Sequence, residues 1–205
     1  MSNEHVFTIG HSNHTLERFM HLLESAGITA VADVRSSPFS RYNPQFNRDV
    51  LETALKGRGM AYVFLGGELG ARSDDPSCYA DGRVQYGRLA LTDPFRDGLQ
   101  RVRKGARKYR LTLMCAEKDP LECHRTILVA RALDAQGVSV SHILADGSRE
   151  EHAAAMTRLL SLVGLPQADL LRSRDQLVEA ACALQEERIA FRESEPSQPV
   201  AQAQR

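Results

Sequence analysis

The sequence of 205 residues contains no tryptophan, only four cysteines and no excess of charge of either sign. With 26 basic and 26 acidic residues its formal net charge is zero, so any binding to nucleic acid requires a local basic patch. No stretch approaches the roughly 18 apolar residues of a membrane span, and no membrane partner is expected. The first residues lack the basic and apolar regions of a secretory signal, which predicts a cytoplasmic protein with reduced cysteines.

The spacing of the cysteines excludes the common four-ligand zinc motifs. They stand at Cys78, Cys115, Cys123 and Cys182, and no pair has the two-residue separation that such motifs repeat. A structural zinc site is therefore not expected, and no metal ligand is assigned from spacing alone.

Short apolar segments alternate with helical segments through most of the chain. This alternation predicts an α/β fold: a three-layer, doubly wound domain with a mainly parallel five-stranded sheet. We expect a single domain over residues 1–165, and a C-terminal helix at 170–192 with a disordered tail within 166–205. The expected strands are 6–10, 29–35, 61–67, 111–115 and 138–145. The expected helices follow Thr15, span Val50–Leu55, and cover 89–108, 124–137 and 149–162, with an irregular stretch at 68–88.

Ligands of open parallel sheets bind beyond the carboxyl ends of the strands, so the residues that follow each predicted strand are the candidate site. The catalytic candidates are Cys115, Cys123, His11, Asp33 and Glu117. The candidates for binding an anion or substrate are Ser12, Arg35, Gly67, His124 and Arg125.

The segment LTLMCAEKDPLECHR, residues 111–125, carries the strongest signal among these candidates. Free N–H groups and the positive end of the dipole at the start of the helix favour an anion and lower the pKa of a nearby thiol. Arg125 adds a group that can clamp phosphate or carboxylate, and His11 or His124 can act as a base. The segment is not the C-x5-R loop of phosphatases, because Leu121 stands six positions after Cys115.

Structural explanations remain open for several of these residues. Cys115 can be a small buried hydrophobe at the end of a strand, and Ser12 can cap the following helix. Asp33 and Arg35 lie two positions apart in a strand and can pair with each other.

Two segments could contribute a local basic patch. The loop SSPFSRYNPQFNR interleaves arginines with aromatic residues, and the run 96–110 holds seven basic residues and one acidic residue. Such patterns suit nucleic acid, but they also occur as an ordered lid or as a solvated helix face.

Four ordered motifs give the chain a family resemblance. TIGHSNHTLERF, VADVRSSPFSRYNPQF, YVFLGGELG and LMCAEKDPLECHR resemble the domain-of-unknown-function 488 family of bacteria and archaea. The resemblance covers residues 7–133 and not the segment beyond about 165. It implies an α/β fold and supports the choice of site, but it implies no defined reaction.

Three functions are compatible with these observations. The first is an enzyme acting on a phosphate-bearing small molecule or nucleic acid, with Cys115 or Cys123 as nucleophile. The second is a metal or redox centre formed by Cys115, Cys123 and a histidine, which would need water or a carboxylate as a further ligand. The third is a non-enzymatic module that binds a nucleotide or nucleic acid. The sequence identifies no cofactor, substrate or oligomeric state.

Overall fold

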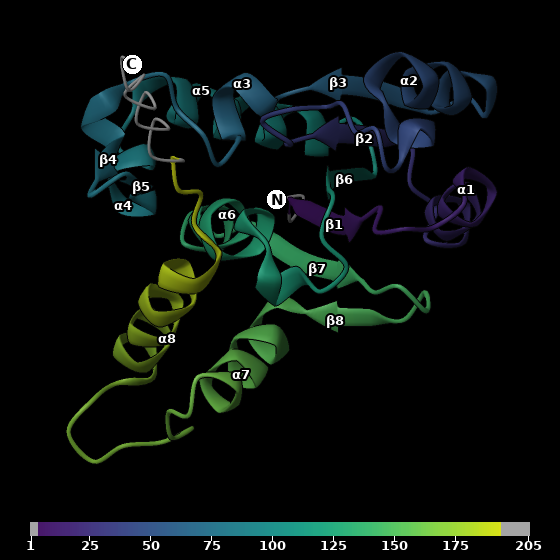
Figure 1. The fold of residues 1–205 in the computed structure, drawn as a ribbon. Coiled ribbons are helices and arrows are strands. Elements are labelled where there is room, and N and C mark those ends of the chain that lie inside the picture. The colour runs from purple at the N-terminus through teal and green to yellow at the C-terminus, as the bar shows by residue number, and fades with distance from the viewer. Residues whose placement is uncertain (1–3, 194–205) are drawn as a thin grey trace, which may run out of the picture.

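A computed structural model describes residues 4–193 and shows a central sheet of six strands (Figure 1). Their order across the sheet is β3-β2-β6-β1-β7-β8, and the first five are parallel. The strands are β1 (His5–Gly10), β2 (Ala30–Asp33), β3 (Ala61–Phe64), β6 (Leu111–Cys115), β7 (Ser139–Ile143) and β8 (Arg149–Glu151). The predicted α/β fold with a mainly parallel sheet is confirmed.

The sixth strand corrects one predicted boundary. Residues expected to start a helix at 149 instead form β8, which pairs antiparallel with β7. Asp146 and Gly147 make the turn, where Gly147 has φ +99° and the N–H of Ser148 donates to Asp146 Oδ1 at 2.8 Å. The chain therefore doubles back into an edge strand before the helix begins at His152.

Helices cover both faces of the sheet because successive strand residues point to opposite sides. The helices are α1 (Leu16–Ser25), α2 (Arg48–Gly57), α3 (Gly66–Leu69), α4 (Tyr86–Leu89), α5 (Asp93–Ala106), α6 (Arg131–Asp134), α7 (His152–Leu162) and α8 (Arg174–Ile189). Phe7 packs in a core with α1 and α2, whereas Val6 packs in a larger core with α5, α6, α7 and α8. The two cores make the molecule a three-layer structure.

Short elements complete the connections. They are the 3-10 turns η1 (Pro44–Phe46), η2 (Pro76–Cys78) and η3 (Pro120–Glu122), the hairpin of β4 (Tyr79–Ala80) and β5 (Arg83–Val84), and the π-helix η4 (Arg125–Ala130). The stretch 68–88, expected to be irregular, thus includes a small antiparallel hairpin. The helix predicted at 124–137 begins as the π-helix and continues as α6.

The C-terminal helix predicted at 170–192 is present as α8. It runs beside α7 (Figure 1), and its Leu177, Ala181 and Cys182 are buried in the larger core. The tail predicted to be disordered lies outside the described residues from 194 onward. None of the helices in the described residues is long and apolar enough to cross a membrane.

Candidate functional site

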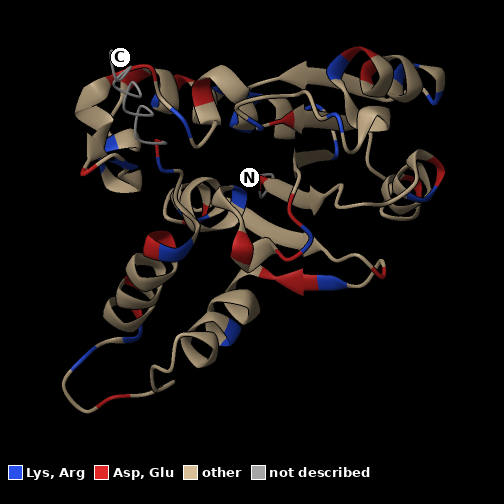
Figure 2. Ribbon diagram, viewed as in Figure 1, with Lys and Arg blue, Asp and Glu red and all other residues tan. Residues whose placement is uncertain are grey.

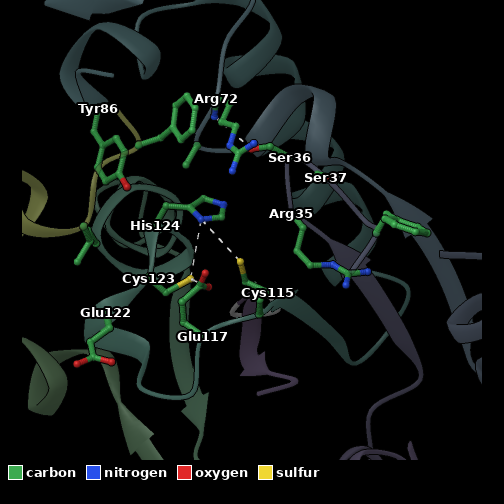
Figure 3. A pocket seen from close by; sticks show the side chains of 15 residues that line it. Arg35, Ser36, Ser37, Arg72, Tyr86, Cys115, Glu117, Glu122, Cys123 and His124 are labelled. Atoms are coloured by element: carbon green, nitrogen blue, oxygen red, sulfur yellow. Dashed lines mark hydrogen bonds between the residues drawn. The ribbon is translucent and has the colours of Figure 1, made fainter. Parts of the chain in front are cut away.

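A pocket of about 420 Å³ opens at the carboxyl edge of the sheet, above the ends of β2 and β6 (Figure 3). Small-molecule sites commonly have this size and this position in parallel sheets. Its lining residues are Arg35, Ser36, Ser37, Phe39, Ala71, Arg72, Tyr86, Cys115, Ala116, Glu117, Glu122, Cys123, His124, Ile189 and Phe191. The pocket thus includes five of the ten predicted site residues, namely Arg35, Cys115, Glu117, Cys123 and His124.

Local structure brings the two cysteines of this pocket together. Cys115 is the last residue of β6, and the chain then loops through η3 to Cys123, which stands just before the π-helix that begins at Arg125. Asp119 caps η3 by accepting the Leu121 N–H at 2.8 Å. The loop lies against Gly10, where a Cβ atom would stand 1.8 Å from the carbonyl oxygen of Glu117, so the close approach requires glycine.

Cys115, Cys123 and His124 form a compact, buried cluster at the floor of the pocket. His124 Nδ1 lies 3.7 Å from Cys115 Sγ and 3.9 Å from Cys123 Sγ, and the three ligand atoms all lie within 4.8 Å of one another. His124 Nε2 donates to the carbonyl oxygen of Val34 at 3.0 Å, which turns Nδ1 toward both sulfurs. Figure 3 shows the imidazole facing both thiols, with a dashed line to each, and Glu117 beside Cys123.

Charges around the cluster shift its titration. Burial and the neighbouring Cys123 raise the pKa of Cys115 well above its ordinary value. Burial opposes ionisation of Cys123 as well, but Cys115, Arg125 and His124 together lower its pKa well below the usual range. The pKa of His124 is raised despite its burial, mainly by Cys123. In the metal-free protein Cys123 is therefore the thiol that ionises first.

Glu117 is the acidic neighbour of this cluster. Cys123 Sγ donates to Glu117 Oε2 at 2.8 Å, and burial and Cys123 raise the pKa of the carboxyl group. A carboxyl group with a raised pKa in a cleft is suited to proton transfer.

Arg125 does not face the pocket as the sequence predicted. Its side chain is fully buried, and Nη1 donates to the carbonyl oxygen of Glu117 at 2.9 Å. The expected clamp on a bound anion is absent from the pocket wall because the guanidinium lies beneath the loop. From there its charge acts on Cys123, whose Sγ also accepts the Arg125 backbone N–H at 3.4 Å.

Asp33 and His11 also lie behind the pocket rather than in its lining. Asp33 is fully buried and accepts hydrogen bonds from Arg35 at 2.9 and 2.6 Å and from Tyr62 Oη at 2.9 Å. His11 stacks on Phe46 with ring centroids 4.3 Å apart, and burial lowers its pKa to about 4. The neutral ring accepts from Arg35 Nη1 at 3.3 Å, so both residues position Arg35.

Ser12 and Gly67 lie outside the lining residues. Ser12 has φ +49° and its N–H donates to the carbonyl oxygen of Ala116 at 2.8 Å, a role that supports the loop. Gly67 is exposed with open space at its Cβ position. Its neighbour Gly66 is the glycine that geometry requires, because a Cβ there would stand 1.9 Å from the carbonyl oxygen of Arg35.

The sequence did not single out several residues that line the pocket. Tyr86 is buried and directs its hydroxyl toward the cluster, and Arg72 and Ser36 line the opposite wall (Figure 3). Tyr86 and Phe191 follow no predicted strand closely, so the strand-end rule could not reach them. Arg72 stands only five positions after the predicted strand 61–67, in the stretch that was expected to be irregular. Ser36 could have been predicted, because it directly follows Arg35 at the end of a predicted strand.

Four of the seven basic residues in the run 96–110 have acidic partners. Arg103 and Arg107 both pair with Glu4, at 2.7 and 2.6 Å, and Arg101 pairs with Glu68. Figure 2 shows basic and acidic positions interleaved over the ribbon. In the loop after β2, Phe46 is fully buried while Phe39 and Tyr42 are exposed. Nucleic-acid binding gains no support from these contacts.

Comparison with known families identifies the residues that a family model covers. A model described as Domain of unknown function DUF488 matches residues 15–132, which is more than half of the chain. The protein belongs to the DUF488 family. The match includes Cys115, Cys123 and His124 but ends before α7 and α8. No curated protein and no solved structure matches the chain.

Proposed function

We propose that Cys115, Cys123 and His124 bind a zinc-class divalent cation at the floor of the pocket, and that the protein is a metal-dependent enzyme acting on a small anionic substrate. The observation that carries the proposal is the spacing of the three donor atoms. In tetrahedral zinc sites, metal–sulfur and metal–nitrogen bonds of about 2.3 and 2.0–2.1 Å place sulfur and nitrogen roughly 3.6 Å apart. The 3.7 and 3.9 Å separations around His124 Nδ1 match this edge.

The surroundings of the three donors also suit a metal. A ligating histidine usually donates its other ring N–H to an oxygen, as His124 does to Val34. Two thiolates and the Glu117 carboxylate carry three negative charges, which a divalent cation and the buried Arg125 guanidinium balance. Thiolate and imidazole together favour zinc over magnesium or calcium.

Three protein ligands are typical of catalytic rather than structural zinc sites, because the fourth position stays available for water or substrate. Glu117 lines the pocket beside Cys123, and with a metal bound it would be the residue placed to take up a proton. Arg72, Ser36 and Ser37 provide donors on the facing wall, which supports an oxyanion such as a phosphate as the substrate group.

Metal binding is tested on the full chain purified without chelator. We expect about one zinc per chain by elemental analysis, and cobalt substitution should give thiolate-to-cobalt charge-transfer absorption. Cys115→Ser, Cys123→Ser and His124→Asn should each weaken binding by more than the roughly 10–100-fold that loss of an outer-shell partner costs. Cys78→Ser and Cys182→Ser change buried cysteines outside the lining residues and should leave affinity unchanged. Wild-type protein that stays metal-free under cobalt titration would contradict the proposal.

The enzymatic part has its own test. Zinc-loaded protein is assayed on a panel of phosphate monoesters and diesters, with Glu117→Gln as the comparison variant. We expect turnover that Glu117→Gln reduces at least about a hundredfold, a typical contribution of a general base. Stoichiometric metal with no turnover on any ester would leave a metal-binding protein and refute the enzymatic assignment for this substrate class.

A thiolate nucleophile is the second candidate for the same residues. It is favoured by the contacts of Cys123 Sγ with the Arg125 N–H at 3.4 Å and with His124 Nδ1 at 3.9 Å, which stabilise a thiolate without a metal. Under this alternative the purified protein carries no metal, and iodoacetamide modifies Cys123 faster than Cys115.

A further inference from the structure

One side of the pocket is closed by a segment that lies outside the part matched by the family model. After α8 the chain turns back over β5 as residues 190–193, here called the strap. The Val84 N–H donates to the carbonyl oxygen of Phe191 at 3.0 Å, and the Glu193 N–H donates to that of Gly82 at 2.8 Å. These bonds hold Phe191 in the pocket wall.

Helix α8 ties the strap to the cluster. Gln185 Nε2 donates to the carbonyl oxygen of Leu121 at 2.9 Å, two residues before Cys123. Glu186 Oε1 accepts the backbone N–H of Tyr86 at 2.7 Å. These two hydrogen bonds fix the position of α8, and with it the strap, relative to the cysteine–histidine cluster.

The guanidinium group of Arg72 lies over the ring of Phe191 in a cation–π contact. The guanidinium carbon of Arg72 lies 4.1 Å from the ring centroid, and the Arg72 backbone N–H donates to Ser36 Oγ at 3.1 Å. No acidic side chain among the described residues pairs with Arg72, although it is exposed at the pocket wall. Its donors are thus available to an oxyanion in the pocket.

Phe39 supplies an aromatic surface from the loop that follows β2. Its side chain is 70% exposed, yet it is one of the residues that line the pocket. A ring in this position can stack on a planar ligand, and stacking removes apolar area from water.

We propose that the strap makes this pocket selective for small anions that carry a planar ring. Phe39 and Phe191 contact the ring, and Arg72 contacts the anionic group. The inference rests on the proposed function in one respect, namely that the pocket above the cysteine–histidine cluster is the substrate site. It identifies the substrate class through Phe39 and Arg72, which the family model covers, together with Phe191 of the C-terminal segment, which it does not.

The test compares two probes that share one anionic group. Inorganic phosphate and phenyl phosphate are titrated calorimetrically into metal-free full-length protein, in which the proposed hydrolysis cannot consume the ester. We expect phenyl phosphate to bind about tenfold more tightly than phosphate, and Phe39→Ala to reduce this preference by about three- to tenfold, in line with the worth of one aromatic contact. Tyr42→Ala, which removes an 81% exposed ring from the same loop outside the pocket lining, should leave the preference unchanged.

Two strap variants separate recognition from folding. Phe191→Leu preserves the apolar volume that packs beneath Arg72 and should reduce the preference without loss of the folded state. Arg72→Ala should weaken both probes and leave their ratio nearly constant. Equal affinities of wild type for the two probes, or an unaltered ratio in both Phe39→Ala and Phe191→Leu, would overturn the proposal.

The metal proposal can fail independently. Metal content and cobalt absorption test the metal proposal. The ratio of the two probe affinities tests only whether the pocket recognises the phenyl ring. A protein that binds no metal but prefers phenyl phosphate keeps the selectivity proposal and loses the metal centre.

Discussion

At the scale of single residues, the site depends on buried polar groups that hold other groups in place. Asp33 and Arg35 make the tightest of these contacts, with three hydrogen bonds and exposed side-chain fractions of 0% and 6%. Removing one member of a buried ion pair leaves the other charge without compensation, which costs more than the intact pair contributes. Arg35 then keeps only its hydrogen bonds with His11 Nε2 and with the carbonyl oxygen of Phe46.

Asp33→Asn should therefore lower the free energy of unfolding by about 3–5 kcal/mol. Urea denaturation followed by circular dichroism measures the change. The matched control is Asp169→Asn, which breaks a pair with Arg172 at the surface, and its unfolding midpoint should stay close to that of wild type. Similar midpoints for the two variants would show that the buried pair contributes no more to stability than the surface pair does.

Gly10 is the second residue on which the site depends. Gly10→Ala places a Cβ 1.8 Å from the carbonyl oxygen of Glu117, so the loop between β6 and η3 must move. We expect a loss of stability of about 1–3 kcal/mol or more, together with weaker cobalt binding, because the loop carries Glu117 and leads to Cys123.

The control for Gly10 is Gly57→Ala near the end of α2, where no atom lies within 4 Å of the added Cβ. Alanine should stabilise the protein there by roughly 0.5–1 kcal/mol, since it restricts the unfolded chain. Unchanged metal affinity in Gly10→Ala would show that this glycine is not needed for the geometry of the site.

At the scale of elements, α8 has more influence on the pocket than its place at the end of the chain suggests. It begins with a capping box in which Ser173 and Gln176 exchange side-chain and backbone hydrogen bonds, at 2.8 and 3.2 Å. Its far end leads directly into the strap. Fraying of α8 would therefore loosen Tyr86 and Phe191 as well as the helix itself.

Ser173→Ala should lower the free energy of unfolding by about 1 kcal/mol, the usual cost of losing an N-cap side chain. Thermal or urea unfolding measures this loss. Ser25→Ala, at the carboxyl end of α1, changes an exposed serine that caps no helix start and should have little effect. If Ser173→Ala unfolds at the wild-type midpoint, the capping box does not limit the stability of α8.

At the scale of the whole molecule, buried histidines link stability to pH. His142 and His152 form a buried pair with ring nitrogens 3.1 Å apart, and Thr8 Oγ1 lies 2.8 Å from His142 Nδ1. Burial lowers the pKa of His142 to about 3, with further contributions from His152 and the charges of Arg125 and Arg158. Burial also lowers the pKa values of His152 and His11.

These shifts predict acid sensitivity with a definite sign. Below about pH 6.5 the unfolded chain protonates these histidines while the folded protein keeps them neutral, so unfolding takes up protons and stability falls as the pH falls. Each histidine contributes up to about 1.4 kcal/mol per pH unit between its unfolded and folded pKa values. The contribution of His142 therefore extends from about pH 6.5 down to about pH 3.

The measurement is the slope of unfolding free energy against pH between 5 and 8. His142→Gln should reduce the slope below pH 6.5 by close to one proton, and the constant cost of the substitution does not affect a slope. His21→Gln changes an exposed histidine of α1 and should leave the slope unaltered. An identical slope in His142→Gln and wild type would show that His142 does not govern the acid response.

The architecture followed from local patterns in the sequence. The continuous apolar segment 111–115 indicates a buried strand, and the helical spacing of apolar residues in 16–25 indicates a helix with one buried face. Both patterns are set by residues that are close together in the chain. The same patterns could not distinguish the edge strand β8 from the first turn of α7, because three polar residues carry no periodicity.

Part of the site followed from sequence as well, since parallel strands must end at one edge. Cys115, Glu117, Cys123, His124 and Arg35 meet in the pocket for this reason. The rule says where a residue lies along a strand and not where its side chain points. Arg125 and Asp33 therefore lie beneath the pocket. There Asp33 pairs with Arg35, and Arg125 Nη1 donates to the carbonyl oxygen of Glu117 while Nε and Nη2 have no hydrogen-bond partner.

Only the tertiary structure decided which groups face the cluster from the far wall. Arg72 comes from the loop after α3, Tyr86 from the start of α4 and Phe191 from the segment after α8, and no local pattern connects them. They meet because backbone hydrogen bonds join Val84 to Phe191 and because α8 packs on the larger core. The sequence by itself determined the layers, the sheet edge and the cysteines and histidine placed there. The shape of the pocket depends on contacts between distant segments, which form only when the whole chain folds.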